Sequence, residues 1–414
     1  MKVLQINIFG NLSTGRIAAD ITRTLTAAGH SGKVAYARNV LPSDVEGIKI
    51  GNDIDVKVHG IMTRITDKAG FFSTHATKQF LKAIDEYNPD IIHLHNLHGY
   101  YLNIELLFNY IKKKNIPVVW TLHDYWSFTG HCAYFDMIGC EKWKTGCYSC
   151  PQKTSYPASF ILDNSKWNYK KKKELFLGVK SLYLVTNANW LGTLVKDSFM
   201  KDYPIQTIYN GIDLNTFVPS ASDARKKYHL ENKIVLLGVA STWDKRKGLT
   251  DFIELSKRLP DQFIIFVVGL SKKQVEELPQ NMIGITRTNN IQELVDIYSM
   301  SDMYMNLTYE DTFPTTNLEA LACGTPVLTY QTGGCPEAID EKSGVVVKCG
   351  DLDEVERLIL NGIYSKFNRT DCVTRGRKFD KNSRYKEYLE LYERIMDKNL
   401  IAKRLNLTAC NILS

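Results

Sequence analysis

Short apolar runs alternate with amphipathic stretches of helical period along both halves of the chain. In the first half the apolar runs predict strands at 3–8, 33–36, 91–95, 118–122 and 182–185. The amphipathic stretches between them predict helices at 17–28, 77–87 and 102–113. Strands separated by helices indicate a parallel sheet with helices on both faces.

The alternation breaks near residues 210–213 and resumes after a polar stretch at 219–232. Strands are then predicted at 234–238, 263–268, 303–306 and 327–330, and helices at 249–259, 291–299 and 383–396. We therefore expect an α/β protein with two doubly wound, Rossmann-like domains, 1–215 and 216–378, and a C-terminal helix and tail at 379–414. Ligands of such sheets bind at the carboxyl ends of the strands, so the expected site is the cleft between the domains.

Length, charge and hydropathy restrict the class of protein. The 414 residues are 44% hydrophobic, which is enough for two buried cores. The net charge of +7 is only mildly basic, and no nucleic-acid partner is expected. No apolar run reaches the roughly 18 residues that a membrane span requires, and the N-terminus becomes polar too soon for a signal peptide. We therefore expect a cytoplasmic protein.

The segment 310–324 combines a helix start with several acids. The acids are Glu310, Asp311 and Glu319. We expect Thr315 and Thr316 to accept hydrogen bonds from the first free backbone amides of a helix that Gly324 ends. The amides and dipole of a helix N-terminus favour an anion. An anion site among carboxylates suits a ligand that has both phosphate and hydroxyl groups, as a nucleotide-sugar does.

Two loops after predicted strands carry cations near a glycine. In the turn 10–16, Gly15 would let the backbone approach a phosphate, with Arg16 nearby. This turn is neither the Gly-x-Gly-x-x-Gly fingerprint nor a Walker loop, and an ordinary tight turn is the alternative. Arg246 and Lys247 follow the first strand of the second domain and would neutralise a diphosphate without a metal. The alternative there is a solvated basic turn.

Histidines gather at neighbouring strand ends of the first domain. His123 follows the strand 118–122 and is expected to face the cleft, while His93, His95 and His98 end the strand 91–95. Metal binding by these histidines is disfavoured, because no acid completes a good ligand spacing.

Together these segments resemble the family 4 retaining glycosyltransferases, which have the GT-B fold of two Rossmann-like domains facing across a cleft. The resemblance rests on the turn with Gly15, on His123, on residues 210–213 with Phe217, on Lys247-Gly248, and on residues 311–319 followed by Ala-Leu-Ala-Cys-Gly-Thr-Pro-Val. The chain departs from the family twice. The first acid of the family's Glu-x7-Glu motif is Asp311 by register, next to Glu310, and Ser241 stands where an Arg is usual.

The resemblance implies a role for each matching residue. Lys247, helped by Arg246, would neutralise the leaving diphosphate, and Glu319 would hold the ribose hydroxyls. Asp311 or Glu310 would hold sugar hydroxyls, and His123 would bond the donor sugar near the reacting carbon. Donor contacts are also expected from Gly15, Arg16, Thr315, Thr316 and Asn317. No metal is expected in catalysis.

The implied function is transfer of a hexose from a UDP- or GDP-sugar to a glycan or lipid-linked saccharide, in cell-surface polysaccharide synthesis. The departures at Asp311 and Ser241 keep a non-catalytic nucleotide-sugar-binding subunit open as an alternative. A nucleotide-sugar epimerase on the same fold is a further alternative.

Four cysteines cluster in an insertion at 130–152 of the first domain. They are Cys132, Cys140, Cys147 and Cys150. Four thiolates can close a tetrahedral zinc site, and the terminal Cys-x-x-Cys has a ligand spacing. Free thiols and disulfides are the alternatives to structural zinc. The position of the insertion after His123 suggests that it shapes the acceptor pocket.

Two segments suggest peripheral contact with the inner face of a membrane. The lysines at 170–173 lie near aromatic and apolar residues, as in an interfacial helix on anionic lipid. The tail from Leu400 carries apolar residues among polar ones. A solvated helix face and a frayed tail are the respective alternatives.

Overall fold

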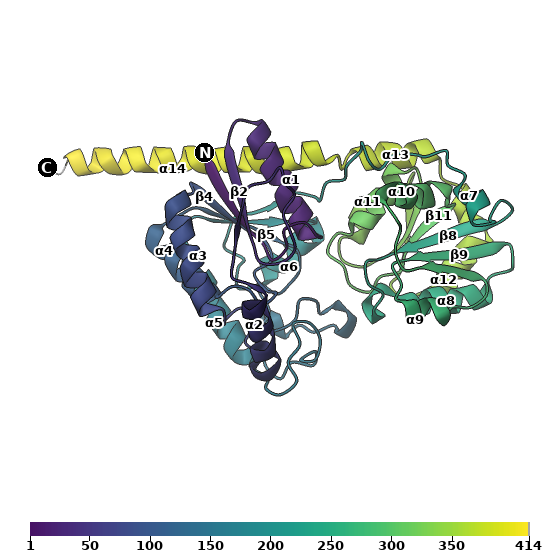
Figure 1. Ribbon diagram of the computed structural model, residues 1–414, viewed down its shortest axis with the longest axis horizontal. Coiled ribbons are helices and arrows are strands. Elements are labelled where there is room, and N and C mark those ends of the chain that lie inside the picture. Colours follow the sequence, from purple (N-terminus) through teal and green to yellow (C-terminus); the bar gives the residue numbers. More distant parts are fainter. Residues whose placement is uncertain (413–414) are drawn as a thin grey trace.

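The computed structural model describes residues 1–412, with the side chains of residues 1–398 and of Leu400. Two parallel-sheet domains stand side by side, and a long C-terminal helix returns from the second domain across the first (Figure 1). Helices cover both faces of each sheet. The predicted fold class is confirmed.

The first domain is built on a seven-stranded sheet of order β3-β2-β1-β4-β5-β6-β7, parallel throughout. Its strands are β1 (Lys2–Ile6), β2 (Ser31–Tyr36), β3 (Gly47–Lys49), β4 (Ile91–Leu94), β5 (Val118–Leu122), β6 (Leu182–Thr186) and β7 (Ile205–Thr207). Its helices are α1 (Thr14–Ala27), α2 (Asp53–Thr66), α3 (Thr74–Tyr87), α4 (Ile104–Lys114), α5 (Ser165–Phe176) and α6 (Asn189–Asp197). The short β3 and β7 and the helices α2 and α6 were not predicted.

The second domain has a six-stranded parallel sheet of order β10-β9-β8-β11-β12-β13. The strands are β8 (Ile234–Val239), β9 (Phe263–Val268), β10 (Met282–Ile285), β11 (Met303–Asn306), β12 (Val327–Tyr330) and β13 (Gly344–Val347). The helices are α7 (Ala224–Lys227), α8 (Leu249–Arg258), α9 (Lys272–Glu276), α10 (Ile291–Met300), α11 (Thr315–Ala322), α12 (Leu352–Leu360) and α13 (Arg369–Arg377). The strand order reverses at β1/β4 in one sheet and at β8/β11 in the other, which are the places where such sheets bind ligands.

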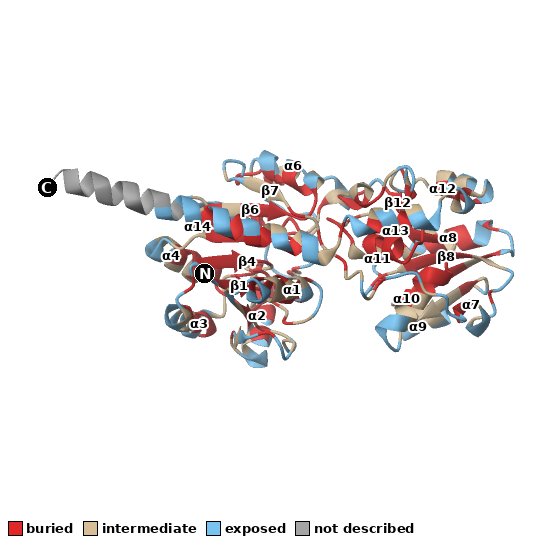
Figure 2. Cartoon of the chain, turned by 90° about the horizontal axis from the view of Figure 1, so that it is seen from above, coloured by how far each residue is buried: buried red, intermediate tan, exposed pale blue. Residues whose placement is uncertain are grey.

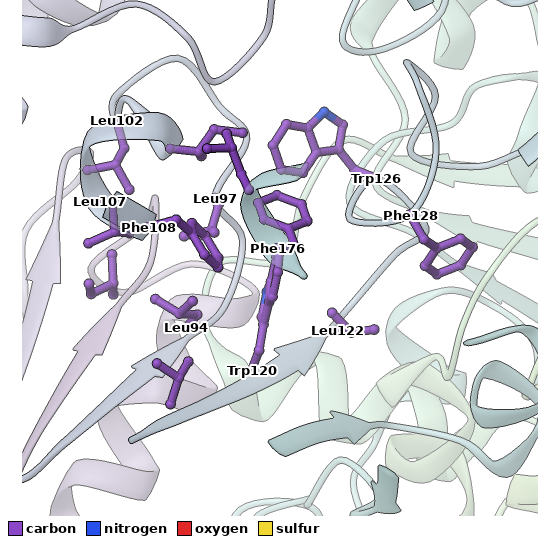
Figure 3. Packing of buried hydrophobic residues seen from close by; sticks show 14 of the residues in the cluster. Leu94, Leu97, Leu102, Leu107, Phe108, Trp120, Leu122, Trp126, Phe128 and Phe176 are labelled. Atoms are coloured by element: carbon purple, nitrogen blue, oxygen red, sulfur yellow. The ribbon is translucent and has the colours of Figure 1, made fainter. Parts of the chain in front are cut away.

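Aromatic side chains fill the core beneath the central strands of the first domain (Figure 3). Trp120 of β5 packs against Phe108 of α4 and Phe176 of α5, with ring centroids 5.7 and 4.9 Å apart. All three rings are buried. This packing holds β5 rigidly and thereby positions the residues that follow it, including His123.

The C-terminal helix α14 (Lys381–Ile412) is longer than the predicted 383–396 and packs on the first domain. It begins just after a backbone bridge between Ile212 and Asp380, in which Ile212 N–H donates to the Phe379 carbonyl at 2.8 Å. Tyr388 and Tyr392 then lie buried against the first sheet. The side chains of the tail from Ile401 lie outside the described residues, so the predicted membrane contact of the tail is not tested.

The helix α5 carries the predicted lysine run, but part of that run faces inward. Lys172 is buried, and its Nζ donates to the carbonyls of Trp126 at 2.6 Å and Thr129 at 3.0 Å. Leu175 and Phe176 are buried as well. These side chains are therefore not available to a lipid surface, because they belong to the core of the first domain.

Candidate active site

The basic turn after β8 is held by a glycine that no other residue could replace without strain. Gly248 has φ +73°, and a Cβ there would lie 2.1 Å from the carbonyl oxygen of Leu307. The preceding Asp244 accepts from the backbone N–H of Lys247. Local geometry thus fixes the backbone that presents Arg246 and Lys247 beside the end of β11.

Both cations of this turn contact the loop that leads to α11. Lys247 Nζ lies 2.5 Å from Asp311 Oδ2, and both side chains are partly exposed. Arg246 donates to the Glu310 carbonyl at 3.2 Å and lies over the ring of Tyr134, 4.6 Å from its centroid. Tyr134 belongs to the insertion of the first domain. The two cations therefore lie where the domains meet, as the sequence predicts.

The adjacent acids Glu310 and Asp311 point to different partners. Glu310 is buried, and its Oε1 accepts from the backbone N–H of Met137 in the insertion at 2.9 Å. Burial raises the pKa of Glu310. Asp311 instead pairs with Lys247. Of the two acids, only Asp311 therefore pairs with a cation of the β8 turn.

The helix α11 begins at Thr315, so its N-cap lies one residue before the expected capping threonines. Its N-cap is Pro314, which has no side-chain acceptor, so the expectation that Thr315 and Thr316 cap the helix is wrong. Both threonines lie in its first turn. Among the described residues, no protein group accepts from the backbone N–H of Thr315 or Thr316. The end of α11 therefore keeps donors for an anion.

Glu319 lies buried in the second turn of α11. Its Oε2 accepts from the hydroxyl of Tyr298 at 2.8 Å, and its Oε1 lies 3.5 Å from the hydroxyl of Thr315. Burial raises the pKa of Glu319, and the positive charge of Arg16 from the first domain opposes this shift. Asn317 is fully buried, and its side chain bonds Asn306 and the Cys335 carbonyl. Its predicted donor contact stays a prediction.

The turn that carries Gly15 brings the first domain to the same place. A Cβ on Gly15 would lie 2.6 Å from the carbonyl oxygen of Phe9, so only glycine fits this close approach of two backbones. Arg16 follows and is exposed. The structure thus brings Arg16 of the first domain close enough to Glu319 of the second for their charges to interact.

A chain of buried side chains determines which nitrogen of His123 carries hydrogen. The Gln5 amide nitrogen donates to the Ala18 carbonyl at 2.7 Å and to Thr22 Oγ1 at 2.6 Å. The Gln5 oxygen must therefore accept from Nε2 of His95, 2.8 Å away. Burial lowers the pKa of His95 well below its ordinary value, so His95 is neutral and its Nδ1 has a lone pair.

That lone pair of His95 faces Nε2 of His123 at 3.1 Å. His123 therefore carries its hydrogen on Nε2 and has a lone pair on Nδ1, in keeping with a pKa that burial lowers to about 4. Within the described part of the chain, Nδ1 of His123 bonds no protein group. It can accept a hydrogen bond from a hydroxyl group.

The other histidines of this edge bond protein groups. His93 bonds the hydroxyls of Thr121 and, on α14, Tyr392. His98 Nε2 lies 2.6 Å from Asp124 Oδ2. Among the described residues, no group of three or more His, Cys, Asp or Glu side chains is placed to hold a metal ion.

Residues that sequence reasoning missed join the two domains beside His123. Thr312 Oγ1 donates to the His123 carbonyl at 3.0 Å and accepts from the Asn187 amide at 3.1 Å. Glu337 accepts from the backbone N–H groups of Asn189 and Trp190 at the start of α6. The only sequence signal was the position of Thr312 inside the acid loop, because contacts between domains leave no periodic pattern.

The four cysteines of the insertion line one small pocket, together with His131 and Trp143. None of them is in a disulfide, and the backbone N–H of Gly130 donates to Cys147 Sγ at 3.1 Å. The insertion therefore gathers four cysteines that are not joined by disulfides.

Two family models match the chain in succession. The model described as Glycosyltransferase Family 4 matches residues 14–216, and that described as Glycosyl transferases group 1 matches residues 220–379. Together they account for nearly all of both domains. In the helices that the structure describes, no stretch is both long and apolar enough to cross a membrane.

Among curated relatives, the chain is 27% identical over 275 residues to the putative colanic acid biosynthesis glycosyl transferase WcaC of Escherichia coli K12, covering 63% of this chain and 64% of that one. It is 26% identical over 203 residues to the N,N'-diacetylbacillosaminyl-diphospho-undecaprenol alpha-1,3-N-acetylgalactosaminyltransferase of Campylobacter jejuni. That match covers 45% of this chain and 53% of the relative. The chain thus spans less than two thirds of the length of these relatives.

Solved structures share the fold over almost the whole chain. Sucrose-phosphate synthase from Thermosynechococcus elongatus superposes with a TM-score of 0.71 at 15% identity, covering 96% of this chain and 100% of that one. Anabaena HepE in complex with UDP superposes with a TM-score of 0.66 at 14% identity, covering 95% of this chain and 100% of HepE.

Proposed function

The chain belongs to the family 4 glycosyltransferases, and from this premise we propose that it moves a hexose, with retention of configuration, from a UDP- or GDP-sugar to a glycan or lipid-linked saccharide. One observation carries the proposal. Where the two domains meet, Lys247 pairs with Asp311 and Arg246 bonds the Glu310 carbonyl, in the loop that leads directly to the free amides of α11, the helix that carries Glu319.

The chemistry requires stabilisation of the negative charge that develops on the departing diphosphate. Lys247, Arg246 and the N–H groups of Thr315 and Thr316 supply that stabilisation, so the proposed catalysis needs no metal. The acceptor attacks from the face of the leaving group, and no protein nucleophile is required. When the diphosphate binds, it competes with Asp311 for Lys247, which frees Asp311 to bond a sugar hydroxyl.

The remaining groups position the donor. Glu319 accepts from the ribose hydroxyls, and its buried carboxylate already accepts from Tyr298. His123 accepts from a hydroxyl of the transferred sugar through Nδ1. Gly15 and Arg16 approach the phosphates from the first domain. Glu310 holds the insertion through Met137 and thereby helps to shape the acceptor side.

Two relatives support the proposed acceptor and the class of pathway. One relative is named for colanic acid biosynthesis, and another for transfer to a diphospho-undecaprenol-linked sugar. These names support a role in cell-surface polysaccharide synthesis on a lipid-linked acceptor, at the cytoplasmic face of a membrane.

A screen of UDP- and GDP-sugars for hydrolysis and transfer tests the proposal. Lys247→Ala should lower kcat about 100-fold, because it removes a charge that acts on the departing phosphate. Lys245→Ala, in the same turn but exposed, is the matched control and should change little. Glu319→Ala should raise KM for the donor. Donor binding without turnover, unaffected by Lys247→Ala, would favour a non-catalytic binding subunit, and an epimerised donor would favour an epimerase.

We further propose that the four cysteines of the insertion bind one structural zinc ion. The pocket that they surround and the N–H donated to Cys147 support this, and the thiols must converge on the ion as it binds. The purified protein should contain about one zinc per chain. Combined Cys147→Ser and Cys150→Ser should abolish zinc binding, whereas Cys349→Ser in the second domain should not. A native protein without stoichiometric zinc would refute the proposal.

A further inference from the structure

The helix α2 presents its apolar residues outward. The residues Ile54, Val58, Ile61 and Ile65 are spaced at helical period along one face, and all four are exposed, Ile54 by 71%. The opposite face, with Val56, is buried against the domain. An ordinary surface helix shows the reverse, an apolar face toward the core and a polar face toward water.

A second apolar segment lies beside the end of this helix. Phe160, Ile161 and Leu162 are exposed by 61%, 64% and 48%. The loop is anchored, because Phe160 N–H donates to the Arg64 carbonyl at 2.7 Å and Leu162 N–H to the Ile65 carbonyl at 3.0 Å. These bonds satisfy the last carbonyls of α2 and align the loop with it. We call the seven exposed apolar residues of the helix and the loop the α2 patch.

Lysines lie in the same helix and loop segments as the α2 patch. Lys57 and Lys166 are exposed, and neither makes an ion pair within the described residues. Lys153 Nζ donates to the Ile161 carbonyl at 3.2 Å, in the middle of the loop segment. Among the nearby acids, Asp67 is buried and bonds His131, whereas Asp55 at the start of α2 is half-buried and Asp163 after the loop is exposed. Asp53 is exposed.

We propose that the α2 patch seats the first domain on an anionic lipid bilayer. An amphipathic helix with apolar residues on one face and lysines beside them lies in the interfacial plane of such a membrane. Each lysine near the surface adds attraction to anionic headgroups. Lysine is depleted at protein interfaces, which makes a second protein the weaker fit.

The α2 patch lies at the end of the first domain opposite α14 (Figure 1), and exposed residues line the outer side of α2 (Figure 2). The predicted contacts through the α5 lysines and the C-terminal tail are different surfaces. The inference rests on the proposed function only in that a lipid-linked acceptor would bring the enzyme to a membrane. Vesicle binding itself requires neither donor nor turnover.

Sedimentation with vesicles tests this surface. Full-length protein should bind vesicles of phosphatidylcholine with phosphatidylglycerol, and bind pure phosphatidylcholine vesicles far more weakly. Ile61→Ser with Phe160→Ser, one change from each segment, should weaken binding more than about tenfold. The matched control is Ile291→Ser with Leu360→Ser, which are exposed apolar residues of the second domain and should change nothing.

A charge variant and a mass measurement complete the test. Lys57→Glu with Lys166→Glu should weaken binding to anionic vesicles and reduce its salt dependence. All variants should unfold at the native temperature, since these side chains are exposed. The proposal is overturned if the native protein does not bind anionic vesicles, or if Ile61→Ser with Phe160→Ser binds them as well as native. Light scattering that shows a dimer lost in that variant, without vesicle binding, would identify a second copy as the partner.

Discussion

The hydrogen-bond chain from Gln5 through His95 to His123 predicts that one substitution affects catalysis and the stability of the fold separately. Catalysis depends on which nitrogen of His123 carries hydrogen. His95→Leu removes the acceptor that holds the hydrogen of His123 on Nε2. The hydrogen can then move to Nδ1, which no longer accepts from a sugar hydroxyl. His95→Asn places an amide oxygen close to the former position of Nδ1 and so retains an acceptor.

The magnitudes follow from the bonds that are lost. His95→Leu removes contacts of 2.8 and 3.1 Å and leaves two buried polar groups, on Gln5 and His123, without partners. A buried group without a partner costs about 1–3 kcal/mol, so the free energy of unfolding should fall by about 2–4 kcal/mol. The effect on catalysis is smaller. Loss of one neutral hydrogen bond to the substrate, about 1 kcal/mol, should lower kcat/KM about fivefold.

The assay measures kcat/KM and the free energy of unfolding for His95→Leu and His95→Asn. His93→Leu is the control, because His93 is equally buried beside His95 but bonds Thr121 and Tyr392 instead of His123. The His93→Leu variant should be less stable than the native protein but should not show the fivefold loss of kcat/KM. His95→Asn should lose stability, because it cannot reach Gln5, but keep most of the native kcat/KM.

A panel of donors tests the tautomer directly. Fluorine in place of a sugar hydroxyl can accept a hydrogen bond but cannot donate one. When fluorine replaces the hydroxyl that His123 contacts, the native protein should therefore use the fluoro-sugar nucleotide as poorly as the deoxy-sugar nucleotide. The reasoning is refuted if the fluoro donor is used as well as the parent sugar, or if His95→Leu and His95→Asn have the same kcat/KM.

Acid should destabilise the fold through its buried histidines. Burial lowers the pKa of His123 to about 4 in the folded protein, whereas the pKa in the unfolded chain is near 6.5. The free energy of unfolding should therefore fall as the pH drops below 6.5, and the fall should be complete near pH 4. At pH 5 the decrease in the free energy of unfolding should be about 2 kcal/mol for His123 alone. Denaturant titration at several pH values measures this decrease, and a free energy of unfolding that stays constant from pH 7 to 5 would contradict the prediction. Gly248→Ala should cost more than about 2 kcal/mol, because its Cβ meets the Leu307 carbonyl at positive φ. Gly29→Ala, at φ +78° with open space around it, should cost about 1 kcal/mol. If Gly248→Ala and Gly29→Ala lower the free energy of unfolding equally, the contact between the new Cβ and the Leu307 carbonyl must be relieved by a backbone shift.

Local pattern was sufficient for much of the fold. β5 is the predicted strand 118–122 to the residue, because a strand buried on both faces is a mostly apolar run, which here lies between Pro117 and His123. The position of His123 after this strand follows directly. Lys247-Gly248 could also be recognised, because a close backbone approach at positive φ accepts only glycine.

Other features depend on contacts between residues far apart in the chain. The adjacent acids Glu310 and Asp311 look alike in sequence but have different partners: Glu310 accepts from Met137 in the other domain, and Asp311 pairs with Lys247 in another loop. Lys172 is part of a lysine run that is typical of an exposed face, yet the core carbonyls of Trp126 and Thr129 hold it inside.

The sequence by itself determined the elements, the two-domain fold and the residue types at the strand ends, because backbone geometry and burial impose periods of two and 3.6 on it. Only the tertiary structure decided which residues meet. It turned the apolar face of α2 outward, joined Gln5 to His123 through His95, and brought Arg16 opposite Glu319. Each of these results from the packing of whole elements and domains, and no local period encodes such packing.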